Sequence, residues 1–223
     1  MQRTNLASRT LPDYTRAEER FNMISHIVGG GMGIAAKVLC VVAEALEGNG
    51  YGVVGGAIFG GSMVALYTIS SVYHGLRGGT GKKVIQILDH CTIYFLIAGT
   101  YTPFCLCTIR QHNPALGWGT FGFVWALAVV GIVLNAIDLK RFQKVSMVLY
   151  LGRGWCIILT GKLIVQLLGS AGFALLVGGG VAYTVGAGFY TLGHKRRYIH
   201  SVFHLFCLVG SGLHILCILF YVI

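Results

Sequence analysis

The chain has 223 residues, of which 55% are hydrophobic and only 11% are charged, and its formal net charge is +10. A soluble domain usually has about 25% charged residues, so this chain has too little polar surface to form a soluble globule. The composition therefore excludes soluble enzymes, disulfide-rich secreted domains and disordered tails, and it predicts that most of the chain lies in lipid.

Apolar runs long enough to cross a bilayer occur seven times along the chain. The predicted spans are 24–46, 52–76, 84–107, 115–137, 145–161, 170–192 and 198–222. The fifth run is the shortest, and Arg153 lies within it. Because the connections are short, consecutive helices should be antiparallel neighbours in one bundle. The sequence thus predicts an all-α, polytopic membrane protein with a short N-terminal segment, 1–23, and a seven-helix transmembrane domain, 24–223.

Basic residues fall almost entirely on one side of this predicted bundle. Thirteen of the 17 Lys and Arg residues lie in the N-terminal segment and in the second, fourth and sixth loops, whereas only Arg110 and Lys162 lie in loops of the opposite side. Lys and Arg collect in short cytoplasmic loops, so the pattern predicts a cytoplasmic N-terminus and an external C-terminus. It also explains the net charge without nucleic acid as a partner. The first 23 residues are polar, and no cleavable signal peptide is expected.

Small residues also recur within the spans. Gly52, Gly56 and Gly60 are four residues apart, a spacing that lets helices approach closely in lipid, so helix packing is predicted for them. The seven cysteines lie mostly in apolar stretches at irregular spacing. We therefore expect small buried residues there and not a disulfide framework.

Several polar residues lie inside the spans, where ionisable groups are costly and suggest a function. The predicted topology places them in one layer near the cytoplasmic leaflet, because they fall at the end of the second span and at the beginning of the first, third and seventh. The residues of this layer are His26, Ser70, His74, Asp89, His90, His200 and His204.

The spacing of His200 and His204 is typical of a helical metal site. Residues four apart project from the same helix face, and His74 from another span is the obvious third ligand. Three protein ligands with an open fourth position describe a catalytic zinc site, so zinc is the predicted cofactor. Asp89 is better placed to contact a water at that position than to bind the metal, although the sequence leaves both roles open. Ser70, four residues before His74, can donate a hydrogen bond to the water or to a polarised carbonyl.

Other interpretations of these residues remain open. A single histidine in a helix is usually a hydrogen-bonded packing residue, which is our interpretation of His112, His194 and His214. Two histidines four apart often arise by chance, and Cys207 could replace one of the ligands. The conjunction of three histidines with an aspartate and a serine at one depth nevertheless favours a metal site.

Five stretches together resemble the hemolysin III family of bacterial membrane proteins. They are Glu19-x-x-Asn22-x-x-x-His26, Ser70-x-x-x-His74, Leu88-Asp89-His90, Ile97-Ala98-Gly99-Thr100-Tyr101-Thr102-Pro103-Phe104 and His200-x-x-x-His204. That family is related to the progestin and adipoQ receptors, which include the adiponectin receptors, and more distantly to the alkaline ceramidases. The resemblance covers roughly residues 18–222.

The resemblance implies a multi-pass protein of the bacterial cell membrane, with seven helices and a cytoplasmic N-terminus. It also implies a zinc ion held by His74, His200 and His204, with Asp89 in contact with the water on the zinc and Ser70 at the position of the family's serine.

Our leading hypothesis is a zinc-dependent intramembrane hydrolase that acts on a lipid-like amide or ester. Zinc would lower the pKa of water toward about 7, Asp89 would act as general base, and Ser70 would stabilise the oxyanion. The alternatives are a zinc-containing membrane receptor or sensor without catalysis and a cytolytic pore-forming protein. The spans show no charged ring or pore-lining stripe, which disfavours the pore. A retinal protein is excluded because residues 198–222 contain no lysine.

Overall fold

The computed structural model describes residues 4–192 and 196–223, and all its regular structure in that range is helical. Residues 1–3 of the predicted N-terminal segment and 193–195 of the sixth predicted loop lie outside it. The long helices are α1 (Arg16–Leu46), α2 (Gly50–Gly75), α3 (Thr80–Pro103), α5 (Pro114–Trp155), α6 (Lys162–Leu192) and α7 (Ile199–Tyr221). The short ones are η1 (Phe104–Ile109), α4 (Arg110–His112) and η2 (Cys156–Thr160). The all-α prediction is thus confirmed for the described residues.

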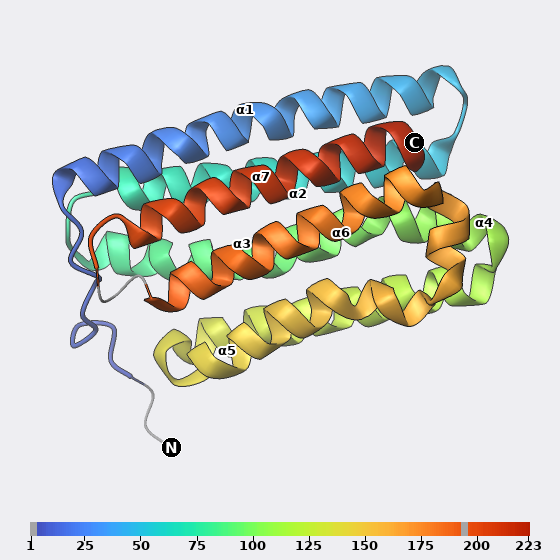
Figure 1. Ribbon diagram of the computed structural model, residues 1–223. Coiled ribbons are helices and arrows are strands. Elements are labelled where there is room, and N and C mark those ends of the chain that lie inside the picture. The colour runs from blue at the N-terminus through green and yellow to red at the C-terminus, as the bar shows by residue number, and fades with distance from the viewer. Residues whose placement is uncertain (1–3, 193–195) are drawn as a thin grey trace.

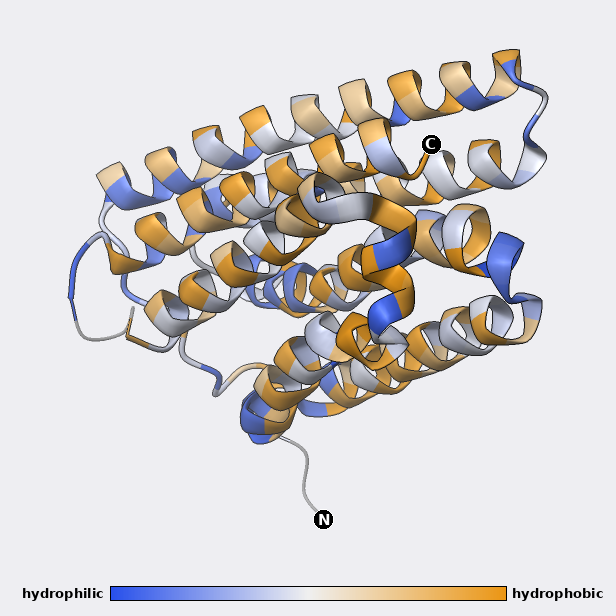
Figure 2. Cartoon of the chain, turned by 45° about the vertical axis from the view of Figure 1, so that its right-hand side comes forward, coloured by the Kyte–Doolittle hydropathy of each residue, from blue (hydrophilic) through white to orange (hydrophobic). Residues whose placement is uncertain are grey.

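The helices are apolar on their outer faces. Six helical stretches in the described chain are long and apolar enough to cross a membrane, when Thr80–His112 and Pro114–Thr160 each count as one stretch. Val148, Leu159 and Phe220 are 70%, 85% and 70% exposed, and Figure 2 shows hydrophilic residues mainly near the ends and connections of the helices. Such an apolar exterior suits lipid and not water. The chain is therefore a polytopic helical membrane protein.

The N-terminus of α1 lies earlier than hydropathy predicts. The helix begins at Arg16 and not at residue 24, because Thr15 provides a capping box. The Thr15 hydroxyl accepts a hydrogen bond from the Glu18 amide at 3.2 Å, and the Glu18 carboxylate accepts one from the Thr15 amide at 2.8 Å. These bonds satisfy amides that have no partner within the helix. The first two turns of α1 therefore add acidic side chains, Glu18 and Glu19, to the polar layer.

The chain reverses direction inside α5. Asp138 has non-helical dihedral angles, φ −159° and ψ 97°, within that helix. Asn135 accepts a hydrogen bond from Ser146 at 2.6 Å and donates one to Tyr150 at 3.1 Å. In a straight helix, positions 135 and 146 would lie about 16 Å apart, so these bonds require a hairpin. Figure 1 shows the two halves of α5 side by side.

Arg153, the cation in the fifth predicted span, is buried against α3. Its guanidinium donates a hydrogen bond to the Tyr94 carbonyl and lies 5.2 Å from the centre of the Tyr94 ring. A buried cation in lipid needs such partners. The pairing therefore fixes the second half of α5 to α3, which hydropathy alone could not predict.

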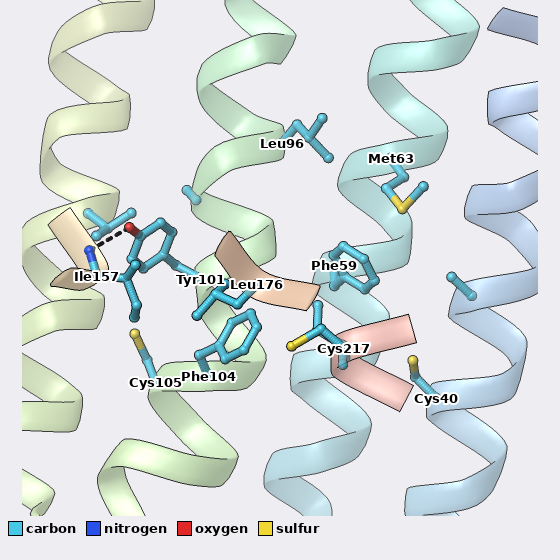
Figure 3. Close-up of a cluster of buried hydrophobic side chains, with 14 of the residues drawn as sticks. Cys40, Phe59, Met63, Leu96, Tyr101, Phe104, Cys105, Ile157, Leu176 and Cys217 are labelled. Carbon is cyan, nitrogen blue, oxygen red and sulfur yellow. Dashed lines mark hydrogen bonds between the residues drawn. The ribbon is translucent and has the colours of Figure 1, made fainter. Parts of the chain in front are cut away.

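The two ends of the bundle have different cores. One end, which we term the histidine end, is defined by His26, His74, His200 and His204, where α1, α3 and α7 begin and α2 ends (Figure 1). The opposite end, the far end, is filled by apolar and thiol side chains (Figure 3). Those that Figure 3 labels include Cys40, Phe59, Phe104 and Cys217.

Glycines allow close contact between α1 and α2, as their spacing predicts. A Cβ atom added at Gly56 would lie 2.5 Å from the Cβ of Cys40, and one added at Gly60 would lie 2.6 Å from the Cα of Lys37. Both distances are too short for a side chain, so these positions require glycine. The packing role predicted for them is confirmed.

Candidate metal centre

Three buried histidines converge at the histidine end. His74 lies in the last turn of α2, whereas His200 and His204 lie in the first turns of α7. One ring nitrogen of each lies within 4.8 Å of those of the other two, and their residues are only 3%, 9% and 1% exposed. The structure thus brings together the three residues that the sequence predicts as metal ligands.

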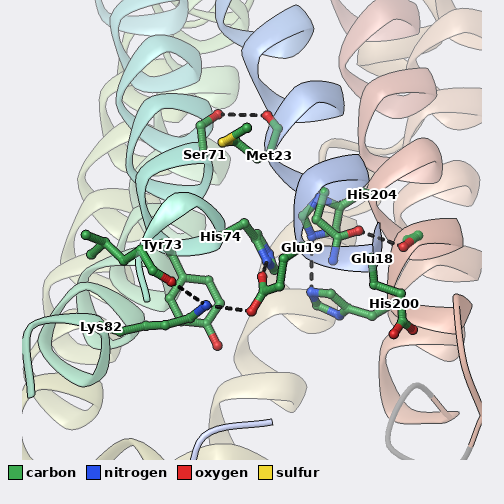
Figure 4. Close-up of polar contacts among 12 residues, drawn as sticks. Glu18, Glu19, Met23, Ser71, Tyr73, His74, Lys82, His200 and His204 are labelled. Carbon is green, nitrogen blue, oxygen red and sulfur yellow. Dashed lines mark hydrogen bonds and ion pairs between the residues drawn. The ribbon is translucent and has the colours of Figure 1, made fainter. Parts of the chain in front are cut away.

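The ring nitrogens of this cluster are arranged as ligands would be. The Nε2 atoms of His200 and His204 face each other at 3.1 Å (Figure 4). Nε2 of His74 is buried and has no hydrogen-bond partner among the described residues. An orphaned imidazole nitrogen in lipid is costly, and a bound cation would satisfy it. The cluster can therefore hold a metal ion.

The start of α7 is fixed by α1. Tyr198, in the left-handed conformation at φ 60°, precedes the helix, and its amide donates a hydrogen bond to Glu18 at 2.6 Å. Ser201 donates another to the Asn22 side chain at 2.7 Å. These two contacts hold the first turn of α7 against α1, so they determine where His200 and His204 lie.

Glu19 contacts the outer nitrogen of His74. One carboxylate oxygen lies 2.6 Å from His74 Nδ1, and the other accepts a hydrogen bond from Lys82 at 2.5 Å (Figure 4). A carboxylate in this position orients a histidine and fixes its tautomer, leaving Nε2 as the donor to a metal. In the sequence, Glu19 stands out only as part of a motif, and no role is predicted for it. A carboxylate in the first turn of a helix that enters the polar layer was the available signal.

Two more aromatic rings stack on the histidines. His26 of α1 lies parallel to His204, with ring centres 3.7 Å apart and planes 20° apart. Tyr14, which precedes α1, stacks on His200 at 4.9 Å. The sequence places His26 in this layer, as the structure does, but nothing in the sequence points to Tyr14. Each ring restricts the orientation of one histidine of the cluster.

Asp89 and Ser70 lie beside the cluster. The Ser70 hydroxyl interacts with the Asp89 carboxylate, and Asp89 also interacts electrostatically with His74. Ser70 is 3% exposed, and Asp89 is half-buried on α3. The two predicted catalytic residues are therefore neighbours of the histidine cluster, and Asp89 is not among the residues whose ligand atoms converge there.

Two other polar residues near the cluster do not join it. His90 contacts the Gln86 carbonyl at 2.9 Å through Nδ1 and the Tyr190 hydroxyl at 3.1 Å through Nε2. Cys207, the possible substitute ligand, is not part of the convergent group found among the described residues.

The sequence matches known membrane proteins over nearly its whole length. Residues 14–215 match the family described as Haemolysin-III related. The chain is 40% identical over 206 residues to Hemolysin-3 of Bacillus cereus, with 92% of each protein covered. It is 39% identical over 208 residues to the Hemolysin-3 homolog of Bacillus subtilis (strain 168), with 93% of this chain and 96% of the relative covered.

A more distant similarity extends to an animal protein. The chain is 24% identical over 164 residues to the Monocyte to macrophage differentiation factor of Homo sapiens, a match that covers 70% of this chain and 66% of that protein.

Proposed function

The chain belongs to the haemolysin-III-related family, as its motifs predict, and on that premise we propose that it is a zinc-dependent membrane hydrolase of lipid-like amides or esters. One observation carries the proposal. Three buried histidines converge beside an interacting aspartate and serine, and Nε2 of His74 has no hydrogen-bond partner among the described residues. Buried ionisable groups in a membrane protein are by default functional, and this set suits hydrolysis.

We propose seven spans with a cytoplasmic histidine end in the bacterial cell membrane. The reversal at Asp138 supports two crossings by the Pro114–Thr160 stretch. The excess of Lys and Arg in the loops of one side supports the orientation. Reporter fusions after residues 138 and 223 test both points. The first should report the cytoplasm and the second the outside, and a shared location would contradict the topology.

His74, His200 and His204 would hold the zinc. Two nitrogens on a tetrahedral zinc lie about 3.3 Å apart, as bond lengths near 2.0–2.1 Å require, and the two facing Nε2 atoms lie 3.1 Å apart. Three imidazoles without a thiolate are typical of a catalytic zinc with an open position. The donor set therefore fits this metal.

The residues around the cluster divide the chemistry of hydrolysis among them. A bound zinc ion supplies Lewis acidity that polarises a carbonyl oxygen and lowers the pKa of water toward about 7. Asp89 accepts a proton from the attacking water, whose oxygen joins the acyl carbon. The bond from carbon to the leaving nitrogen or oxygen breaks, and Asp89 returns the proton to that atom. The Ser70 hydroxyl donates a hydrogen bond to the carbonyl oxygen as its negative charge develops.

Glu19 acts as a positioning residue for His74. Its carboxylate accepts the Nδ1 proton of His74, so the lone pair of Nε2 points toward the cluster. Lys82, at 2.5 Å, neutralises the charge that this carboxylate brings into the bundle. The pair therefore keeps one ligand in a single tautomer without leaving a net charge in lipid.

Turnover of defined lipids by the purified protein tests the proposal. Mass spectrometry should detect the fatty acid released from N-acyl amides or acyl esters. Asp89→Asn should lower that turnover by at least about 100-fold, because a general base is lost, while zinc stays bound. Asp13→Asn is the matched control. It removes a carboxylate that is exposed, and it should keep full activity. Equal turnover by wild type and Asp89→Asn would overturn the proposal.

A zinc-containing receptor or sensor is a second candidate, because the same ligand set can be purely structural. In that case Asp89→Asn would bind zinc and the protein's lipid or protein ligand as wild type does, and no lipid would be cleaved by either.

A cytolytic pore is suggested by the names of the two Bacillus relatives. Purified protein in liposomes tests it through dye release. A pore should release dye in proportion to dose whether or not a chelator has removed metal, whereas a hydrolase should release none from vesicles of uncleavable lipid.

A further inference from the structure

Unsatisfied polar atoms lie where α1 meets α7, beyond the three histidine ligands. Both ring nitrogens of His26 and Nδ2 of Asn22 are buried without hydrogen-bond partners in the described part of the chain. His26 and Asn22 are 3% and 0% exposed. Such groups cost free energy unless something bonds to them. They therefore point to a polar ligand at the α1/α7 seam, which we define as the contact between these two helices.

The geometry of His26 suits a ligand that lies beside the metal ligands. Its ring is nearly parallel to that of His204, and the nitrogens of an imidazole form bonds in the ring plane. Hydrogen bonds from His26 therefore run alongside the plane in which His204 presents its own nitrogens. A neutral histidine has one donor and one acceptor, and the Asn22 amide adds a second donor. This set matches an amide or hydroxyl group.

Farther along the same two helices, the seam widens into an apolar groove. The groove has a volume of about 470 Å³, and its lining includes Met32, Ala35 and Leu39 of α1 and Val209, Gly212 and Leu216 of α7. Small side chains at three of its positions, Ala35, Ala36 and Gly212, leave the space open. Leu39 and Val209 are 54% and 53% exposed, so the groove opens onto the outer surface of the bundle.

The polar atoms and the groove follow each other in a fixed order. Both helices run from the histidine end toward the far end, side by side (Figure 1). Met32 lies six residues after His26, and Val209 lies five after His204, so the groove begins about 7.5–9 Å beyond the histidines. The hydrogen-bonding groups lie at the depth of the metal ligands, because His26 stacks on His204 and Asn22 bonds to Ser201, and the apolar groove follows them along the seam. That is the order of polarity in a lipid with a head group and a chain.

We propose that the α1/α7 seam is the substrate-binding site, an inference that rests on the hydrolase function proposed above. The acyl chain of an N-acyl amide lipid lies in the groove, and its amide bonds to His26 and Asn22 next to His204. The substrate reaches the metal sideways from the bilayer. A bilayer lipid that only lies against the protein surface would occupy the groove without contacting the buried polar atoms. Because both features are present, we assign the site to a substrate.

A photoreactive lipid tests the assignment without requiring turnover. The probe is an N-acyl amide with a diazirine in the middle of its chain, mixed with the purified full-length protein in lipid nanodiscs. Mass spectrometry locates the crosslinked peptides. We expect them in residues 32–39 and 209–216. Crosslinks spread evenly over all lipid-facing helices, or gathered on α5 and α6, would overturn the proposal.

Filling the groove should remove these crosslinks. Gly212→Trp adds a large ring where an added Cβ has only Met32 nearby, at 3.6 Å, and it should lower the crosslinking yield about tenfold, the effect of 1.4 kcal/mol. Gly122→Trp is the matched control, because Gly122 on α5 is exposed with open space around it, and it should leave the yield unchanged. Ala35→Trp fills the same groove from α1 and replaces Gly212→Trp if that variant does not fold.

The variant His26→Phe tests whether the buried polar atoms of the seam bind the amide. It keeps an aromatic ring stacked on His204 and removes both ring nitrogens. Unlabelled N-acyl amide should compete with the probe several-fold better than an alkane of equal length in wild type, and equally well in His26→Phe. An unchanged preference in that variant would overturn the role of His26.

The binding site and the hydrolase function can fail independently, and the experiments distinguish the two cases. Lipid cleavage with crosslinks outside the seam contradicts only the binding site. Crosslinks in the seam without lipid cleavage contradict only the hydrolase function.

Discussion

The histidine end and the far end of the bundle lie in the same lipid but have different interiors. At the far end, buried side chains such as Phe59, Phe104 and Cys217 fill the space, and the hydroxyl of Tyr101 both donates to Gly154 and accepts from Ile157 (Figure 3). At the histidine end, imidazole and amide nitrogens of His26, His74, His204 and Asn22 are buried without partners among the described residues, whereas toward the far end such atoms are fewer and include Oε2 of Glu44 and Nδ1 of His214.

The contrast separates stability from function within one helix bundle. Apolar packing at the far end lowers the free energy of the folded chain through close contacts. Unsatisfied nitrogens at the histidine end raise it, so they are expected to persist only where a ligand or metal satisfies them. Substitutions at the two ends should therefore have different consequences for metal binding and for stability.

The largest effect is expected from His200→Ala/His204→Ala, which removes two of the three ligands. Mass spectrometry of untagged protein, purified without chelator, should find about one zinc per chain in wild type and none in the double variant. His214→Gln is the matched control on the same helix, since His214 is also buried but contacts the Leu176 carbonyl at 3.1 Å. Zinc retained by the double variant would contradict the site.

Glu19→Gln should weaken zinc binding without abolishing it. The amide still reaches His74 but lacks the negative charge, and loss of such a carboxylate typically costs about 10–100-fold in metal affinity. Competition with a chelator of known affinity measures the change. Glu47→Gln, at an exposed site after α1, should bind zinc as wild type does. If the two variants bind equally, Glu19 does not position His74.

Gly56→Ala tests the far end, where we expect a loss of stability and not of metal. Its added Cβ would lie 2.5 Å from that of Cys40, and such overpacking costs about 1–3 kcal/mol. Thermal unfolding in detergent should show the loss, with the zinc content of the folded protein unchanged. Gly61→Ala, with nothing within 4 Å, should unfold as wild type does, and equal unfolding of the two variants would refute the close contact.

The smallest effect is expected where the N-terminal segment meets the turn of α5. The Thr4 hydroxyl and amide donate to Asp138 at 2.6 and 2.8 Å and lower the pKa of its carboxyl to about 2. A lowered pKa means that ionised Asp138 holds the segment above the usual value of 3.8, and that this contribution is lost as pH falls toward about 2. Asp138→Asn should lack it at any pH.

Pepsin cleavage within residues 4–13 measures this difference. At pH 4 the segment should be cut faster in Asp138→Asn than in wild type, whereas at pH 2 the two should be cut at nearly the same rate. A constant ratio across this range would show that ionised Asp138 does not hold the segment.

Much of the architecture and of the site could be predicted from the sequence. Long apolar runs require helices in lipid because every backbone amide must be satisfied there, and the described residues are helical as expected. A separation of four residues puts His200 and His204 on one face of any helix, so their pairing did not depend on the fold. The depth of His74 in the second span suggested it as the third ligand, the family resemblance implied the same residue, and the structure brings it to them.

Helix ends and turns were less predictable. Hydropathy does not register the capping box at Thr15, although it does predict a break after residue 137, where Asp138 interrupts α5. The partner of Arg153 is a backbone carbonyl of α3, and a carbonyl leaves no mark in a sequence pattern.

The sequence by itself therefore determined that the chain is a bundle of membrane helices with a polar layer at one end, because hydropathy and helical periodicity depend only on neighbours along the chain. Only the tertiary structure decided that Glu19 contacts His74, that His26 stacks on His204, and that a groove continues from them between α1 and α7. These contacts join residues far apart in the chain, and they depend on how the helices pack and rotate against one another.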